Sequence, residues 1–201
     1  MLKNTKDAKD APKKSIEISK SGAWNGTFPH MVDQSFGTAL VSLLKERKIT
    51  SITDFGCGSG GYIKMISEAR IFARGFDGNP NTEELDVSGG LCIGPVDLTQ
   101  ERTWNVTDAA MSIEVAEHIP AQFEDVFVSN LASSARDLII LSWGVPGQKG
   151  TGHVNGKTAM AVEQKMKEHG WAKDKEPTRK LQTAATFRWI RRNVQVFSKT
   201  A

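Results

Sequence analysis

The residues best suited to chemistry lie in one short stretch, where an acid is followed by alternating glycines. Asp54 ends a short apolar run, and Gly56, Gly58 and Gly60 follow it at every second position. Because glycine has no Cβ atom, such a turn adopts conformations closed to other residues and lets a ligand approach the backbone closely. The helix expected after the turn would direct free N–H groups and the positive end of its dipole at that ligand. The stretch therefore predicts a site for a nucleotide-like ligand.

The spacing of these glycines fits two kinds of cofactor site. Residues 56–61 (GCGSGG) satisfy the pattern G-x-G-x-x-G, which binds the pyrophosphate of dinucleotides. Counted from Asp54, the same stretch satisfies acid-x-G-x-G-x-G, which resembles motif I of the Rossmann-like S-adenosylmethionine (SAM) methyltransferases. An ordinary flexible loop is the third interpretation that a glycine pattern alone allows.

A second acid, Asp77, lies about twenty residues beyond the glycine turn, at the end of the apolar run 71–76. At the carboxyl end of a second strand, a carboxylate can accept hydrogen bonds from both hydroxyls of a ribose. Asp77 also begins the sequence Asp-Gly-Asn-Pro, whose residues all favour turns. The two roles are compatible, and we expect a ribose contact.

Two further segments bring acids to predicted strand ends. Asp97 follows the apolar run 91–94 and could accept a hydrogen bond from an adenine amino group while Leu98 packs on the ring. An aspartate that caps a helix or simply lies in a loop is an equal alternative. Glu114 follows the strand predicted over 106–113. Because ligands of doubly wound sheets bind outside the carboxyl ends of the strands, Glu114 should face the cofactor and the reacting group.

Two histidines are candidates for a catalytic base, since histidine titrates near neutrality. His118 directly follows Glu117, a few residues after the fourth predicted strand. For His118 we favour a structural role or a role beside the cofactor. His153 lies in the segment 144–156, which has five glycines among thirteen residues. Loops longer than about 12 residues are often functional, so His153 is the better candidate on the acceptor side.

Taken together, four segments resemble the class I SAM-dependent methyltransferases of the small-molecule type. They are 54–60 (DFGCGSG), 75–77 (GFD), 96–98 (VDL) and 112–120 (SIEVAEHIP). Residues 142–155 also resemble a group of such proteins found partly in viruses and phages. The resemblance implies SAM as the cofactor, with the glycine turn against its methionine and ribose part and Glu114 beside the sulfonium. The residues to which it gives cofactor contacts are Asp54, Gly56, Cys57, Gly58, Gly60, Asp77, Gly78, Asp97, Leu98 and Glu114.

The elements that must position these residues alternate between strand and helix. Apolar runs predict strands over 52–55, 71–76, 91–94, 106–113, 137–142, a sixth from Trp171 and a last one over 194–197. Helical spacing predicts helices over 36–48, around 63–66, over 122–133 and over 157–169. A strand, a helix and a strand in this order form a parallel unit with a right-handed crossover. With the resemblance, the expected fold is a single α/β domain with a doubly wound, mostly parallel seven-stranded sheet, helices on both faces and an antiparallel last strand.

The whole chain bounds the class of protein. Its 201 residues fit one domain, and 39% hydrophobic and 24% charged residues indicate neither disorder nor a membrane protein. The start of the chain lacks the apolar core of a signal peptide, so we expect a cytoplasmic location. Residues 1–21 read as a solvated arm and 22–201 as the enzyme domain. The two cysteines, Cys57 and Cys92, make no metal-ligand spacing, and we expect no metal.

Two segments allow more than one interpretation. The cluster Trp24, Phe28, His30 and Met31 could fold over the cofactor as a lid or simply dock on the core. The second segment is the basic end of the chain. The net charge of +3 is too small to imply that the protein binds nucleic acid. Arginines at 188, 191 and 192 would share one helical face, which is commonly only solvated, although an anion could bind there.

The sequence as a whole favours a SAM-dependent methyltransferase with a small or medium-sized acceptor. An NAD-dependent oxidoreductase fits the glycine turn and Asp77, but the chain has little room for a separate substrate domain. A partner subunit that binds SAM without catalysis is a second alternative, favoured by the lack of an obvious base. Nucleic-acid or protein methylation is a third. Enzymes that methylate nucleic-acid amino groups often carry [DNS]-P-P-[YFW] where this chain has residues 114–117 (EVAE), so we do not favour that partner. No sequence feature specifies an oligomeric state.

Overall fold

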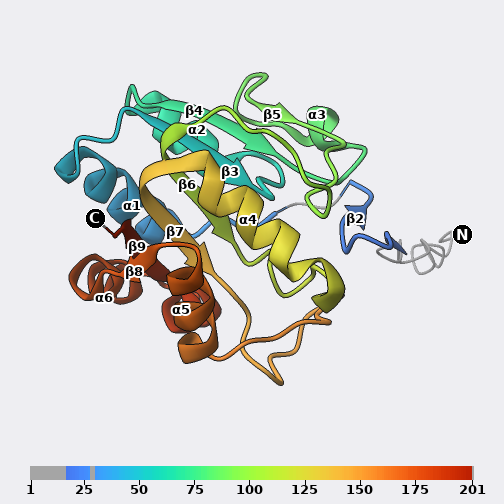
Figure 1. Cartoon of the computed structure of the whole chain (residues 1–201). Coiled ribbons are helices and arrows are strands. Elements are labelled where there is room, and N and C mark those ends of the chain that lie inside the picture. The colour runs from blue at the N-terminus through green and yellow to red at the C-terminus, as the bar shows by residue number, and fades with distance from the viewer. Residues whose placement is uncertain (1–16, 28–29, 201) are drawn as a thin grey trace, which may run out of the picture.

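The computed structural model of the chain describes residues 17–27 and 30–200 (Figure 1). Most of the predicted arm, residues 1–16, lies outside the described residues, as do Phe28 and Pro29 of the aromatic cluster. The end of the predicted arm forms a hairpin, in which β1 (Glu17–Ile18) pairs antiparallel with β2 (Trp24–Asn25).

A seven-stranded sheet forms the centre of the molecule (Figure 1), with the strand order β5-β4-β3-β6-β7-β9-β8. The strands are β3 (Ser51–Phe55), β4 (Phe72–Phe76), β5 (Cys92–Ile93), β6 (Thr107–Ile113), β7 (Ala135–Ser142), β8 (Trp171–Lys173) and β9 (Gln195–Lys199). The first five are parallel to one another, whereas β9 runs antiparallel to both β7 and β8. The predicted mostly parallel sheet with an antiparallel last strand is confirmed.

Helices cover both faces of the sheet, as predicted. The helices are α1 (Gln34–Glu46), α2 (Gly61–Glu68), α3 (Thr82–Leu85), the 3-10 turn η1 (Ala121–Phe123), α4 (Glu124–Ser134), α5 (Ala159–Glu168), α6 (Lys175–Ala184) and α7 (Arg188–Asn193). One core joins buried residues of α1, α2, α6 and α7 to the sheet, and a second core joins those of α4 and α5 to the opposite face. Within the described residues, no helix combines the length and the apolar character needed to cross a bilayer.

Helix α1 shows how a local sequence pattern sets an element in place. Phe36, Leu40 and Leu44 recur at helical spacing and are fully buried. Asp33 caps the helix by accepting from the N–H of Phe36 at 3.1 Å. Its second carboxyl oxygen accepts from the N–H groups of Thr186 and Phe187 at 2.6 and 2.7 Å. One buried carboxylate thus joins the start of α1 to the segment between α6 and α7.

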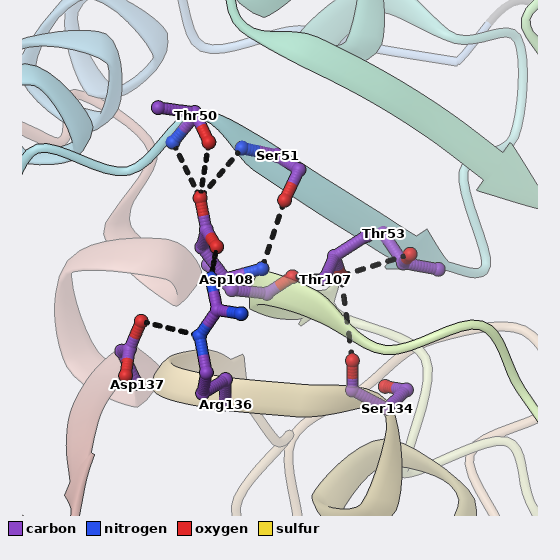
Figure 2. A network of polar contacts seen from close by, with 9 residues as sticks. Thr50, Ser51, Thr53, Thr107, Asp108, Ser134, Arg136 and Asp137 are labelled. Atoms are coloured by element: carbon purple, nitrogen blue, oxygen red, sulfur yellow. Dashed lines mark hydrogen bonds and ion pairs between the residues drawn. The ribbon is translucent and has the colours of Figure 1, made fainter.

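The amino ends of β3, β6 and β7 are joined by a polar network around Asp108 (Figure 2). The Oδ2 atom of Asp108 accepts from the N–H and hydroxyl of Thr50 and from the N–H of Ser51, at 2.7, 2.6 and 3.1 Å. The Oδ1 atom pairs with the guanidinium of Arg136, and the hydroxyl of Ser51 accepts from the N–H of Asp108. Every oxygen of this buried carboxylate is therefore bonded.

The sequence patterns did not predict the hairpin or the helices α3, α6 and α7. Strands of two residues carry too little alternation to be recognised, which explains β1 and β2. Helix α3 spans only Thr82–Leu85. Helix α6 is rich in lysine and contains Pro177 in its first turn, and it buries only Pro177, Thr178 and Leu181. Such a polar stretch gives a weak periodic signal.

Candidate functional site

A cavity of about 480 Å³ opens at the carboxyl ends of the parallel strands. Its walls include Gly56 after β3, Asp77 after β4 and Glu114 after β6. This is where ligands bind in doubly wound sheets, and the volume suits a small-molecule or cofactor site. The glycine turn and two of the predicted acids are therefore brought together at one cavity.

The structure separates the predicted site residues into two groups. Those that line the cavity are Gly56, Asp77, Leu98, Glu114, His118 and His153. Those that are not among the lining residues are Asp54, Cys57, Gly58, Gly60, Gly78 and Asp97. The second group supports the first, and its contacts show how.

The glycine turn is held in a left-handed conformation and is bonded to Asp77. Gly56, Gly58 and Gly60 all have positive φ values, of 87°, 54° and 75°. A Cβ atom on Gly58 would lie only 2.7 Å from the Nδ1 atom of His30, so the position requires glycine on two grounds. The N–H of Gly58 donates to Oδ2 of Asp77 at 2.8 Å.

Asp77 and Asp97 both perform the turn functions that the sequence offered as alternatives. The Oδ1 atom of Asp77 accepts from the N–H of Asn79 at 2.8 Å, and that of Asp97 accepts from the N–H and hydroxyl of Thr99 at 2.9 and 2.6 Å. Asp77 nevertheless lines the cavity, and Leu98 does so beside Asp97. These contacts fix both loops against the cavity wall.

Three more residues outside the cavity lining, Cys57, Gly60 and Gly78, pack tightly on their neighbours. Cys57 fills the space above Gly75 next to Cys92, and its contact with Cys92, together with burial, raises the pKa of its thiol. A side chain on Gly60 would meet Cys92, and one on Gly78 would meet Ala23 of the hairpin. Cys57 is thus a packing residue in the free chain, and both cysteines are free thiols.

Asp54 is a buried acid near the carboxyl end of β3, just before the glycine turn. It is 3% exposed, and its Oδ1 atom has no hydrogen-bond partner among the described residues. Burial, followed by the charge of Asp77, raises the pKa of Asp54 well above its usual range. A cationic ligand at the cavity would favour the charged form of this carboxyl.

Glu114 is held by three side chains from three other segments. Its Oε1 atom accepts from Ser142 at the end of β7 and from Asn193 of α7, both at 2.9 Å. Its Oε2 atom accepts from Gln148 at 3.0 Å. The residue itself has a φ of 56°, which is rare for a side chain other than glycine. The network fixes the carboxylate and ties the glycine-rich loop to the sheet.

Glu117 and the two candidate histidines meet on one wall of the cavity. Glu117 is fully buried, and neither of its carboxyl oxygens has a hydrogen-bond partner in the part of the chain that the structure describes. Its Oε1 atom lies 3.9 Å from Nε2 of His153. The rings of His118 and His153 stand edge to face, with centroids 4.9 Å apart. The sequence placed these residues in two separate segments.

Burial also sets the protonation of this wall. It raises the pKa of Glu117 to about 8, with a further contribution from the charge of Glu114, while the nearby N–H groups of Glu117 and Gly144 oppose the shift. It lowers the pKa of His118 to about 4, with a further contribution from His153. His118 is therefore a neutral imidazole at pH 7. A neutral imidazole can accept a hydrogen bond or bind a ligand through its lone pair, but it is poorly suited to donate a proton as a general acid.

The hairpin and α7 supply aromatic walls. Trp24 stands edge to face on His118 with centroids 5.5 Å apart, and it lines the cavity together with His30 and Met31. Phe187 and Trp189 line another part. Trp24, His30 and Met31 thus lie at the cavity mouth, a position that fits both the predicted lid and the predicted docking segment.

Several residues of the site were not found in the sequence. Gln148 lies in the glycine-rich loop, and its amide could have been singled out as a polar group close in sequence to His153. Asn193 gave no signal, because its place depends on how α7 packs. The predicted arginine cluster at 188, 191 and 192 is exposed on α7 and is not part of the cavity lining; Arg191 instead bonds the carbonyl of Ala185.

The sequence matches no protein-family model and no curated protein, but solved structures share its fold. A sugar N-methyltransferase from a Streptoalloteichus species has a TM-score of 0.68 at 12% identity, over 100% of this chain and 99% of that chain. A magnesium protoporphyrin IX methyltransferase from Synechocystis with bound S-adenosylhomocysteine (SAH) has a TM-score of 0.58 at 16% identity, covering 87% of this chain and 90% of that one.

A third structure is 1,6-didemethyltoxoflavin-N1-methyltransferase from Burkholderia thailandensis, with bound 1,6-didemethyltoxoflavin and SAH. It has a TM-score of 0.60 at 13% identity, over 84% of this chain and 80% of that chain. At such identities the likeness concerns the fold. The chain has the Rossmann-like methyltransferase fold.

Proposed function

We propose that the chain is a SAM-dependent methyltransferase that acts on a small or medium-sized acceptor. The observation that carries the proposal is the cavity at the carboxyl ends of the strands, which Gly56, Asp77, Leu98 and Glu114 line together. In this arrangement Asp77 would bind the ribose hydroxyls, Leu98 would pack on the adenine, and Glu114 would lie beside the sulfonium. The fold of the methyltransferases described above supports the same assignment.

The charges around the glycine turn favour SAM over a dinucleotide. Asp77 and Glu114 line the cavity, whereas burial and the charge of Asp77 hold the pKa of Asp54 well above its usual range. The carboxylates of Asp77 and Glu114 would repel the anionic pyrophosphate of NAD and attract the sulfonium and ammonium groups of SAM. The N–H of Gly58, which a pyrophosphate would need, already donates to Asp77. An NAD-dependent activity is therefore the weaker proposal.

SAM would supply the methyl group together with its leaving group, so the protein has mainly to orient the acceptor and exclude water. The aromatic walls of Trp24, Phe187 and Trp189 suit an acceptor with an apolar face. If the acceptor must lose a proton, His153 is the group to take it, because its Nδ1 lies 3.1 Å from the carbonyl of Gln148 and the Nε2 lone pair is then free. His118 is the second candidate.

Titration calorimetry with SAM, SAH and NADH tests this proposal. We expect micromolar binding of SAM and SAH by the wild type and binding at least about tenfold weaker by Asp77→Asn, since a hydrogen bond to a charged group is at stake. The matched control is Asp137→Asn, an exposed acid near the amino end of β7, which should bind as the wild type does. Binding of NADH alone would contradict the proposal.

Binding of the sulfur ligands without methyl transfer to any acceptor would instead indicate the partner subunit considered above. A cytoplasmic location, the arm at residues 1–21 and the domain at 22–201 stay predictions from the sequence. Nucleic-acid or protein acceptors would be recognised by methyl transfer to those polymers that weakens as the ionic strength rises.

A further inference from the structure

Three potential metal ligands converge on the wall of the cavity next to the Glu114 network. Glu117, His118 and His153 each offer one ligand atom, and these atoms all lie within 4.8 Å of one another. The residues come from the segment after β6 and from the glycine-rich loop. Backbone bonds from the N–H groups of Val154 and Asn155 to the carbonyl of Glu117, at 2.9 and 3.0 Å, hold the two segments together. The convergence is therefore built into the backbone.

The carboxyl group of Glu117 is an independent indication of a ligand. The residue is 0% exposed, and neither carboxyl oxygen finds a hydrogen bond within residues 17–27 and 30–200. Burying a carboxyl group without partners is costly, and buried charges in proteins are paired or coordinate metals. The Nδ1 atom of His118 is likewise buried and lacks a hydrogen bond among the described residues.

His153 is oriented in the way that metal ligands are. Its Nδ1 atom lies 3.1 Å from the carbonyl oxygen of Gln148, so an N–H there donates to that carbonyl and leaves the lone pair on Nε2. Nε2 is the atom that faces Glu117. A side chain at position 150 would overlap the imidazole, so glycine there gives His153 its place. Gln148 in turn bonds Glu114, which connects this orientation to the cofactor wall.

We propose that Glu117, His118 and His153 bind one divalent transition-metal ion at the edge of the cavity. Two imidazoles and one carboxylate suit Zn²⁺, Fe²⁺, Co²⁺ or Ni²⁺ better than Ca²⁺ or Mg²⁺, which prefer oxygen ligands. Three protein ligands leave at least one coordination position open toward the cavity. The inference revises the expectation of no metal, which was drawn from the cysteines alone and not from residues that meet only in the fold.

The role of such an ion rests on the proposed function. An open position would bind a hydroxyl oxygen of the acceptor and lower its pKa, so that the proton would pass to solvent without a protein base. The resulting oxyanion would take the methyl group of SAM, with SAH as the leaving group. The ligand role of His153 uses the same Nε2 lone pair as the base role given above, so the two roles exclude each other. The acceptor class that fits is one in which a hydroxyl oxygen is the methylated atom.

Metal binding can be measured without SAM or an acceptor, so its failure is distinguishable from failure of the proposed function. We would strip the full chain with a chelator, dialyse it against Co²⁺ or Zn²⁺, and count bound metal per chain. The wild type should bind one equivalent and show the visible absorption of Co²⁺ bound to imidazole. Glu117→Gln and His153→Gln should each weaken binding by at least about 100-fold, since even outer contacts of a metal site matter by 10–100-fold.

The control is His169→Gln, which alters the histidine at the end of α5 and should bind metal as the wild type does. SAM affinity and thermal unfolding of each variant, measured in the metal-free state, report whether it folds. A second test needs no variant: one equivalent of Zn²⁺ should raise the unfolding temperature of the wild type. Absence of stoichiometric metal in the wild type, or equal binding by a folded Glu117→Gln protein, would overturn the proposal.

Discussion

The two ends of the central sheet treat a buried carboxylate in opposite ways. At the amino end, Asp108 accepts three hydrogen bonds from Thr50 and Ser51 and pairs with Arg136 (Figure 2). At the carboxyl end, Glu117 is buried more completely, yet its oxygens have no hydrogen bond among the described residues. A satisfied carboxylate joins strands and stabilises the fold, whereas one without partners is suited to a ligand. The difference separates the structural end of the sheet from the functional one.

The largest expected effect is at the structural end. Asp108→Ala leaves the N–H groups of Thr50 and Ser51 without their acceptor and should lower the free energy of unfolding by roughly 3 kcal/mol. Glu117→Gln in metal-free protein should change it by less than about 1 kcal/mol, because no hydrogen bond is broken and no charge is left unpaired. Urea unfolding of both variants measures the contrast. Equal losses of unfolding free energy in the two variants would show that Glu117 stabilises the fold as Asp108 does.

A smaller effect is expected for Asp33, a third buried carboxylate that is fully bonded. Burial alone would raise the pKa of Asp33, but hydrogen bonds from the N–H groups of Phe187, Phe36 and Thr186 outweigh it and hold the pKa below its usual range. A lowered pKa in the folded state stabilises the protein above the ordinary carboxyl pKa of about 3.9, and that contribution is lost as pH falls through the folded value.

Asp33→Asn should accordingly cost about 1–2 kcal/mol at pH 7, because an amide cannot accept from all three donors. The difference from the wild type should shrink as the pH falls from the ordinary carboxyl pKa of about 3.9 through the lower pKa of the folded state. Urea unfolding across pH 2–7 measures it. A difference that stays constant with pH would mean that the charge of Asp33 contributes nothing.

The sequence predicted the fold well because its signals are local. Apolar runs located β3 and β6 to within a residue at either end, and the glycine turn and Glu114 follow those strands directly. Helix α6 escaped because its buried face is reduced to Pro177, Thr178 and Leu181, too few for a clear period. The position of the cavity was predictable because ligands of doubly wound sheets bind at the carboxyl ends of the strands, whichever residues lie there.

The metal cluster could not be predicted in the same way, because it depends on long-range packing. Glu117 and His153 meet only because the loop after β7 returns to the carbonyl of Glu117. Asn193 reaches Glu114 through α7, whose position the sequence does not encode locally. Single segments thus indicate the cofactor wall, while the neighbouring cluster of Glu117, His118 and His153 can be recognised only in the folded chain.

The most direct test of the central claim is a crystal structure of the protein with SAH. The account predicts SAH in the cavity at the carboxyl ends of β3, β4 and β6, with its ribose hydroxyls on Asp77 and its adenine against Leu98. SAH bound elsewhere, or a cavity that stays without SAH at saturating concentration, would contradict the claim that this end of the sheet is the cofactor site.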